Sequence, residues 1–221
     1  MIARRSMLAL LGMAALGATV LSAHGWPALA AGEFEVTARK FVDVIGAEAI
    51  KVFGTPDKDT RYRNFRELLN RSFDVPAIAR FVLGAYWGKL KGDQQATFLK
   101  VFEDYVVANY AAKPWQVEGV YIEVVSAQPF NENDIAVDTL IHVPHKQNKP
   151  IGLGWRIFNS APAPKIIDLK VDGLSLVVSQ RAEFTSVLRQ KNNNFPAFIE
   201  FVVQRTRQLE NTPQPQKSAS N

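Results

Sequence analysis

The apolar positions of this chain follow a helical period up to about residue 112 and a strand period beyond it. From Phe34 to Phe53, apolar residues recur every three or four positions, which is typical of an amphipathic helix. Similar spacing and helix-start signals predict further helices from Asp59 to Ser72, from Asp74 to Gly84 and from Gly92 to Tyr110. The first half of the chain is therefore predicted to be helical.

Beyond Pro114, apolar and polar residues alternate. This alternation predicts four strands, over residues 120–124, 135–143, 151–157 and 165–171. In the last strand the inward set is predicted to be Ile167, Leu169 and Val171. Because the connections are short and rich in turn residues, consecutive strands are expected to pair antiparallel, with one face of the sheet buried.

Two more helices are predicted after the strands. One begins at Ser175, a preferred N-cap residue, and the other runs from about Pro196 to Leu209. Helices, then a meander, then helices indicate an α+β domain, with helices packed on one face of a four-stranded sheet.

Such a layout can leave an apolar cavity between the helices and the sheet. We expect the cavity to be lined by Phe81, Tyr105, Val137, Ile141, Trp155, Leu176, Phe184 and Leu188. The alternative is a periplasmic interaction protein with a filled core, in which the aromatic and aliphatic stripes contact only one another. An acyl chain placed in the cavity would gain about 0.8 kcal/mol for each CH₂ removed from water, and no catalytic group would be needed.

The two ends of the chain are predicted to lie outside this domain. Residues 1–30 resemble a secretory signal peptide, with Arg4 and Arg5 before an apolar run and an Ala-x-Ala cleavage site ending at Ala30. The paired arginines also fit part of a twin-arginine signal, and an uncleaved anchor is the other alternative. Residues 31–210 are then the exported domain, and residues 211–221 are predicted to be a disordered tail.

The composition of the chain argues against thiol chemistry and against nucleic-acid binding. The chain has no cysteine, so it has neither disulfides nor thiol chemistry. The formal charge of +5 falls to +3 without the two arginines of the signal, and the basic residues form no stripe with interleaved aromatics. A nucleic-acid partner is therefore not expected. No cofactor is expected either, because Gly152-Leu153-Gly154 lacks the third glycine of a dinucleotide-binding loop and leads into a strand.

Few residues suggest catalysis or metal binding. His142 and His145 lie beside one strand end without carboxylates at ligand spacing, so no metal site is expected. Asp168 or Asp172 would act as the base if the protein were instead a cavity enzyme, such as an isomerase acting on a hydrophobic substrate. Arg80 is expected to be buried and to form a salt bridge with Asp74, Asp104 or Asp168, or alternatively to contact a lipid phosphate.

The segment from Phe73 to Trp87 has the most distinctive sequence. Asp74 is a candidate N-cap, Pro76 is in the first turn, and Gly84 is a candidate stop for the helix. The segment resembles the F-D-x-x-x-I-A-R-F-V-L-G-x-Y-W signature of the MlaC-type lipid-binding proteins, also called the toluene-tolerance auxiliary family. The stretch from Phe65 to Leu69 is similar to the family's F-R-x-L-L, and Gly173 to Phe184 is similar to its G-x-S-L-V-x-x-x-R-x-x-F.

The resemblance implies more than the residue pattern does. The family fold is a curved antiparallel sheet wrapped by helices, of the nuclear-transport-factor-like kind, around an apolar cavity. Its members are periplasmic carriers, not enzymes, that move phospholipid between an outer-membrane lipoprotein–porin complex and an inner-membrane ABC transporter with an MCE-domain component. The chain also resembles the hopanoid-associated branch, HpnM, which implies a hopanoid as the other possible ligand.

Overall fold

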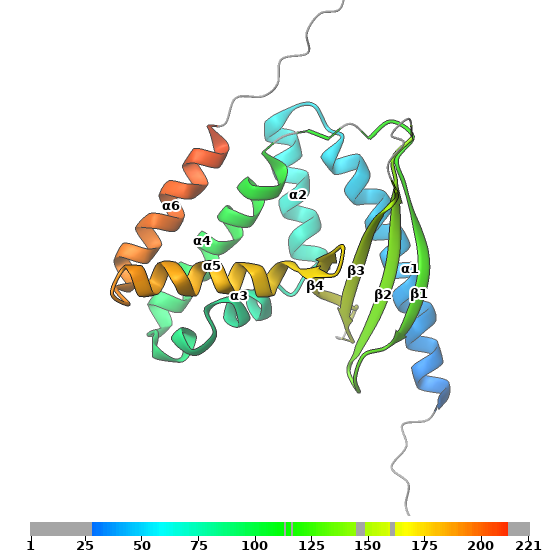
Figure 1. Cartoon of the computed structure of the whole chain (residues 1–221), viewed down its shortest axis with the longest axis horizontal. Helices are drawn as coiled ribbons and strands as arrows, with labels where there is room; N and C mark the ends of the chain where they lie inside the picture. The colour runs from blue at the N-terminus through cyan, green and yellow to red at the C-terminus, as the bar shows by residue number, and fades with distance from the viewer. Residues whose placement is uncertain (1–27, 113, 116, 145–148, 160–161, 212–221) are drawn as a thin grey trace, which may run out of the picture.

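Antiparallel strands form one curved, open sheet in the order β1-β2-β3-β4-β5, standing at one side of the molecule (Figure 1). The computed structural model describes residues 28–112, 114–115, 117–144, 149–159 and 162–211. The strands are β1 (Tyr121–Pro129), β2 (Asp134–His142), β3 (Ile151–Phe158), β4 (Lys165–Val171) and β5 (Leu174–Ser175). The predicted α+β class and antiparallel meander are confirmed. The predicted count of four strands misses β5, which is too short to show an alternation.

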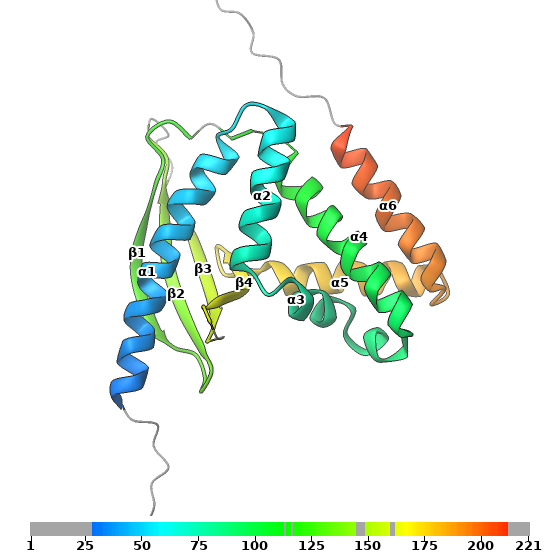
Figure 2. The ribbon, with the colours of Figure 1, turned by 180° about the vertical axis from the view of Figure 1, so that it is seen from behind.

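Helices cover the inner face of the sheet and extend away from it. They are α1 (Ala28–Phe53), α2 (Lys58–Ser72), α3 (Val75–Leu83), the 3-10 helix η1 (Gly84–Lys89), α4 (Gly92–Ala111), α5 (Leu176–Gln190) and α6 (Phe195–Glu210). Seen from behind, α1 runs along β1 and β2, while α2, α4 and α6 spread out beside it (Figure 2). Helix α5 crosses this group and packs on α3. No helix within the described residues is both long and apolar enough to cross a membrane.

The helix-start and helix-stop signals read from the sequence are confirmed. The Asp74 carboxylate accepts a hydrogen bond from the Ala77 N–H at 3.0 Å, and the Ser175 hydroxyl accepts one from the Val178 N–H at 3.1 Å. Gly84 ends α3 with a φ of 54°. Helix α1, however, begins six residues before the predicted Phe34. Residues 1–27 of the predicted signal and residues 212–221 of the predicted tail lie outside the described residues.

The predicted inward set of β4 is wrong at its start. Ile166 and Asp168 are buried, whereas Ile167 is only half-buried. The pairing with β3 shifts between Arg156 and Ile157, so β4 carries one extra residue there. Such a bulge changes which side chains face the core, and alternation alone does not reveal it.

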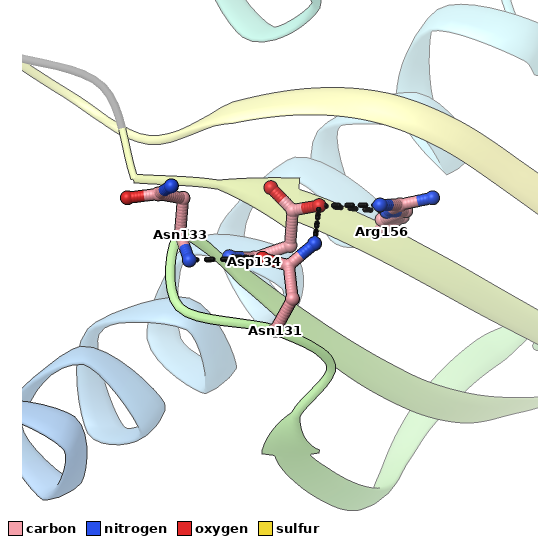
Figure 3. A network of polar contacts seen from close by, with 4 residues as sticks. All are labelled: Asn131, Asn133, Asp134 and Arg156. Atoms are coloured by element: carbon pink, nitrogen blue, oxygen red, sulfur yellow. Dashed lines mark hydrogen bonds and ion pairs between the residues drawn. The ribbon is translucent and has the colours of Figure 1, made fainter.

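A polar network fixes the turn between β1 and β2 (Figure 3). The Asn131 side-chain oxygen accepts hydrogen bonds from the backbone N–H groups of Asn133 and Asp134, each at 2.9 Å. The buried Asp134 carboxylate accepts hydrogen bonds from Arg156 at 2.6 and 2.9 Å and from the Asn131 amide at 2.9 Å. This network explains why the turn predicted at residues 131–134 is rich in asparagine and aspartate.

A fully buried arginine joins α2 to the ends of two other helices. Arg61 donates to the carbonyls of Thr55 and Pro56, which follow α1, and to those of Ala111 and Ala112 at the end of α4, at 2.6 to 3.2 Å. The last carbonyls of a helix lack partners within the helix and carry partial negative charge. Burial lowers the pKa of the Arg61 guanidinium. No local sequence pattern distinguishes Arg61 from the exposed arginines of the same helix.

The two main sequence motifs meet where α3 packs on α5. The Arg181 guanidinium lies 5.0 Å from the centre of the Phe81 ring, and a Cβ on Gly84 would come within 2.7 Å of Arg181 Nη2.

The prediction of a buried, salt-bridged Arg80 is wrong, because this residue is exposed and its guanidinium lies 5.7 Å from the centre of the Trp87 ring. Tyr86 donates a hydrogen bond to the Asn193 side chain at 2.8 Å. The signature therefore describes a junction between helices.

Replacing Gly84 with alanine should lower the free energy of unfolding by about 1–3 kcal/mol. The positive φ strains any residue with a Cβ, and the methyl group would also displace Arg181. Urea unfolding followed by circular dichroism measures the change. The control is Gly88→Ala, because Gly88 is exposed and nothing lies within 4 Å of a Cβ placed on it. Equal effects of the two changes would contradict a special role for Gly84.

Candidate functional site

A cavity of about 640 Å³ lies between the inner face of the sheet and helices α1 to α5. Its size is within the range of pockets that hold small organic ligands. Almost every lining side chain is apolar: Ile45, Ala49, Ile50, Phe53, Phe65, Leu68, Leu69, Phe73, Val75, Ile78, Val82, Phe102, Val106, Trp115, Val117, Val120, Ile122, Ile141, Val143, Ile151, Leu153, Trp155, Leu169, Val171, Leu176 and Val177. The internal apolar cavity expected from the sequence is therefore present.

The cavity occupies only one half of the sheet's inner face. At this end Ile122, Ile141 and Ile151 are neighbours across β1, β2 and β3, and all three line the cavity. Toward the other end of β2 and β3, Val137 and Ile157 are fully buried and do not line it. The alternating pattern is the same in both halves, so periodicity identifies the inward face but not the hollow part of it.

A filled aromatic core lies beside the hollow part, between α4, α5 and α6. Phe184 packs against Phe98, Phe102, Tyr105 and Phe198, with ring centres 5.3 to 6.3 Å apart. Phe102 also lines the cavity and so forms the boundary between the two regions.

The eight expected lining residues are divided between these regions. Ile141, Trp155 and Leu176 line the cavity. Tyr105, Val137, Phe184 and Leu188 are buried outside its lining, and Phe81 is 42% exposed under Arg181. From the signature segment, the structure places Phe73, Val75, Ile78 and Val82 in the wall instead.

Three polar side chains interrupt the described wall: those of Tyr110, Asp168 and Gln180. Asp168 accepts a hydrogen bond from the Val177 N–H at 3.3 Å, at the start of α5, where a carboxylate stabilises the helix. Burial raises the pKa of the Tyr110 hydroxyl, and the nearby negative charge of Asp168 adds to this effect. Tyr110 is therefore neutral at physiological pH. The Trp155 indole donates to the Thr139 hydroxyl at 2.9 Å, which fixes the ring in the wall.

The other candidates for chemistry lie elsewhere. Asp172 is exposed in the β4–β5 turn with a φ of 47°, and its carboxylate accepts a hydrogen bond from the Gly152 N–H at 3.2 Å. His142 stacks on Tyr121 and contacts the Glu123 carboxylate at 2.8 Å. His145 lies outside the described residues, and within the described part of the chain no group of acidic and histidine side chains is arranged to hold a metal ion.

The cavity opens to solvent where its wall is exposed. Three of its described lining residues are exposed: Trp115 by 52%, Ile151 by 41% and Val171 by 36%. Trp115 stacks on Phe53 at the end of α1, with ring centres 4.2 Å apart. Sequence reasoning missed Trp115, because it is a single aromatic residue in a loop after Pro114. Its only signal was a large apolar side chain among turn residues.

A second hollow lies at the start of α3. It is shallow and is lined by Asp74, Ala77, the four turn residues 131–134, Phe158 and Ile167. The polar groups there are engaged in helix capping and in the turn network. The apolar cavity is therefore the better candidate site.

The fold and the cavity together define a small α+β binding domain with a hollow apolar interior. The profile of the family described as MlaC protein matches residues 39–203, roughly three quarters of the chain, so the protein belongs to the MlaC family. Its fold is similar to that of a phospholipid-binding protein from Ralstonia solanacearum, solved in complex with a phospholipid. That match has a TM-score of 0.64 and 20% sequence identity, and it covers 79% of this chain and 97% of the other. No curated protein matched the chain.

Proposed function

We propose that the protein is a periplasmic lipid carrier that holds the acyl chains of a phospholipid in the apolar cavity. The observation that carries this proposal is the almost wholly apolar wall around about 640 Å³ of space. Burying a sixteen-carbon chain there would gain on the order of 10 kcal/mol before ordering costs. Membership of the MlaC family and the phospholipid bound to the Ralstonia solanacearum protein support the choice of ligand.

Two further parts of the proposal come from the family resemblance. The carrier would be exported by a signal peptide cleaved near Ala30, and it would exchange lipid with the inner-membrane ABC transporter and the outer-membrane lipoprotein–porin complex. A hopanoid is the alternative ligand, because a rigid apolar polycycle is also suited to an apolar wall. The cavity favours a carrier over an interaction protein with a filled core.

Protein purified without detergent from its native host should retain lipid. Solvent extraction and mass spectrometry identify the lipid and its ratio to protein, and a phospholipid or a hopanoid at close to one per protein is the expected result. Protein free of both lipids would contradict the proposal. Turnover of a small hydrophobic substrate that is abolished by Asp168→Asn would instead support the cavity enzyme.

A further inference from the structure

Four exposed apolar side chains lie in the cavity wall or directly beside it: Trp115, Ile151, Val171 and Leu174, here called the mouth rim. The first three line the cavity itself. Leu174 pairs directly with Val171 across the β4–β5 turn. Directly paired residues of antiparallel strands project from the same face, so Leu174 lies beside Val171 but outside the cavity lining.

Leu174 is held outward by the backbone of a tight turn. Asp172 and Gly173, the two turn residues, have φ values of 47° and 85°. The Asp172 carboxylate also accepts a hydrogen bond from the Gly152 N–H. This hydrogen bond anchors the turn to the start of β3, next to Ile151. Leu174 is 72% exposed, more than any other large apolar residue in the described part of the chain. An ordered turn thus holds an aliphatic side chain in solvent.

From these contacts we propose that the mouth rim inserts into the interface of a lipid bilayer, so that the cavity opens directly toward the hydrocarbon. This inference rests on the proposed function. A lipid whose tails leave the cavity through an immersed rim does not expose them to water. Tryptophan is a typical residue at the bilayer interface, because its ring is apolar and its N–H is polar.

The small extent of the rim suits contact with the bilayer around the proposed transport complexes better than it suits a separate protein interface. A stable protein–protein interface buries about 800 Å² on each side, with 20 to 30 residues. The mouth rim has four side chains, and a fluid bilayer requires no complementary shape from them. Because none of the four is charged, insertion should depend little on salt, unlike adsorption through basic residues.

Because the chain has no cysteine, one labelled position can report insertion. Leu174→Cys and Val125→Cys, each carrying the polarity-sensitive dye NBD, are compared in the full chain. Val125 is 53% exposed on β1 and does not line the cavity. Vesicles of phosphatidylcholine, alone or mixed with phosphatidylglycerol, are then added at low and at high salt. The emission maximum of the dye at position 174 should shift to shorter wavelengths at both salt concentrations, while that of the dye at position 125 should not. Equal responses at the two positions, or none at 174, would overturn the proposal.

A second comparison separates docking from lipid binding. Leu174→Asp should lower binding to the same vesicles, and the rate of phospholipid transfer between them, by about tenfold or more. Its content of co-purified lipid should stay at the wild-type level, and Val125→Asp should match wild type in all three measurements. Lipid-loaded wild-type protein that never binds vesicles would refute the mouth-rim proposal alone and point to a protein partner. Wild-type protein without lipid would refute the proposed function itself.

Discussion

Replacing Val106 with tryptophan is expected to remove most of the lipid bound by the protein while the fold persists. Val106 is half-buried on α4 and lines the cavity. An indole there occupies space that two or three methylene groups of the ligand would fill. Because each CH₂ removed from water contributes about 0.8 kcal/mol, the affinity should fall roughly ten- to sixtyfold. Lipid extraction and mass spectrometry measure the loss, and far-UV circular dichroism checks the fold.

The matched control is Val125→Trp. It introduces the same side chain at an exposed position of β1 that does not line the cavity, so the lipid content should not change. If Val106→Trp kept the wild-type lipid content with a native spectrum, the bound lipid would lie somewhere other than this cavity.

Replacing Arg61 with methionine should lower the free energy of unfolding by about 3–5 kcal/mol. Methionine keeps most of the aliphatic length of arginine but cannot donate to the four carbonyls that Arg61 contacts. Buried acceptors without partners are costly, and here they lie at the ends of α1 and α4, which wall the cavity. A chain of this size should lose on the order of 10 °C in Tm. Urea and thermal unfolding measure both quantities.

Arg63→Met is the control on the same helix. Arg63 is exposed and donates one hydrogen bond to the Thr60 hydroxyl at 3.1 Å, so its removal should change stability by less than about 0.5 kcal/mol. A similarly small change for Arg61→Met would mean that water replaces the guanidinium without cost. The expected large difference between the two arginines therefore tests the network.

Local signals in the sequence predicted the fold well. Asp74 and Ser175 are caps because a short polar side chain reaches the free N–H groups of a first turn, and that requirement is local. The change of period near Pro114 likewise reflects backbone geometry within a few residues. The phase of β4 was missed, because the bulge opposite Arg156 depends on pairing with β3.

The position of the cavity was harder to predict than its presence. Tyr105 and Phe184 have the helical spacing of inward residues, but they lie in the aromatic core, whereas Leu176 lines the cavity. Which inward residues line the cavity depends on the distance between the sheet and helices α1 and α4. That distance is set by tertiary packing and not by the local sequence. Arg61 and Arg80 show the same limit for charges, since the sequence suggested burial for the wrong one.

The near absence of polar groups from the cavity wall affects how a cargo is chosen. Hydrophobic contact has no preferred direction, so such a wall distinguishes molecules by length and bulk and hardly by their functional groups. Acyl chains that differ by one or two carbons would compete on similar terms, because each methylene contributes only about 0.8 kcal/mol. In a carrier built this way, head groups are distinguished at the mouth or by the membranes that supply them, and the interior serves as a container for whatever apolar length fits.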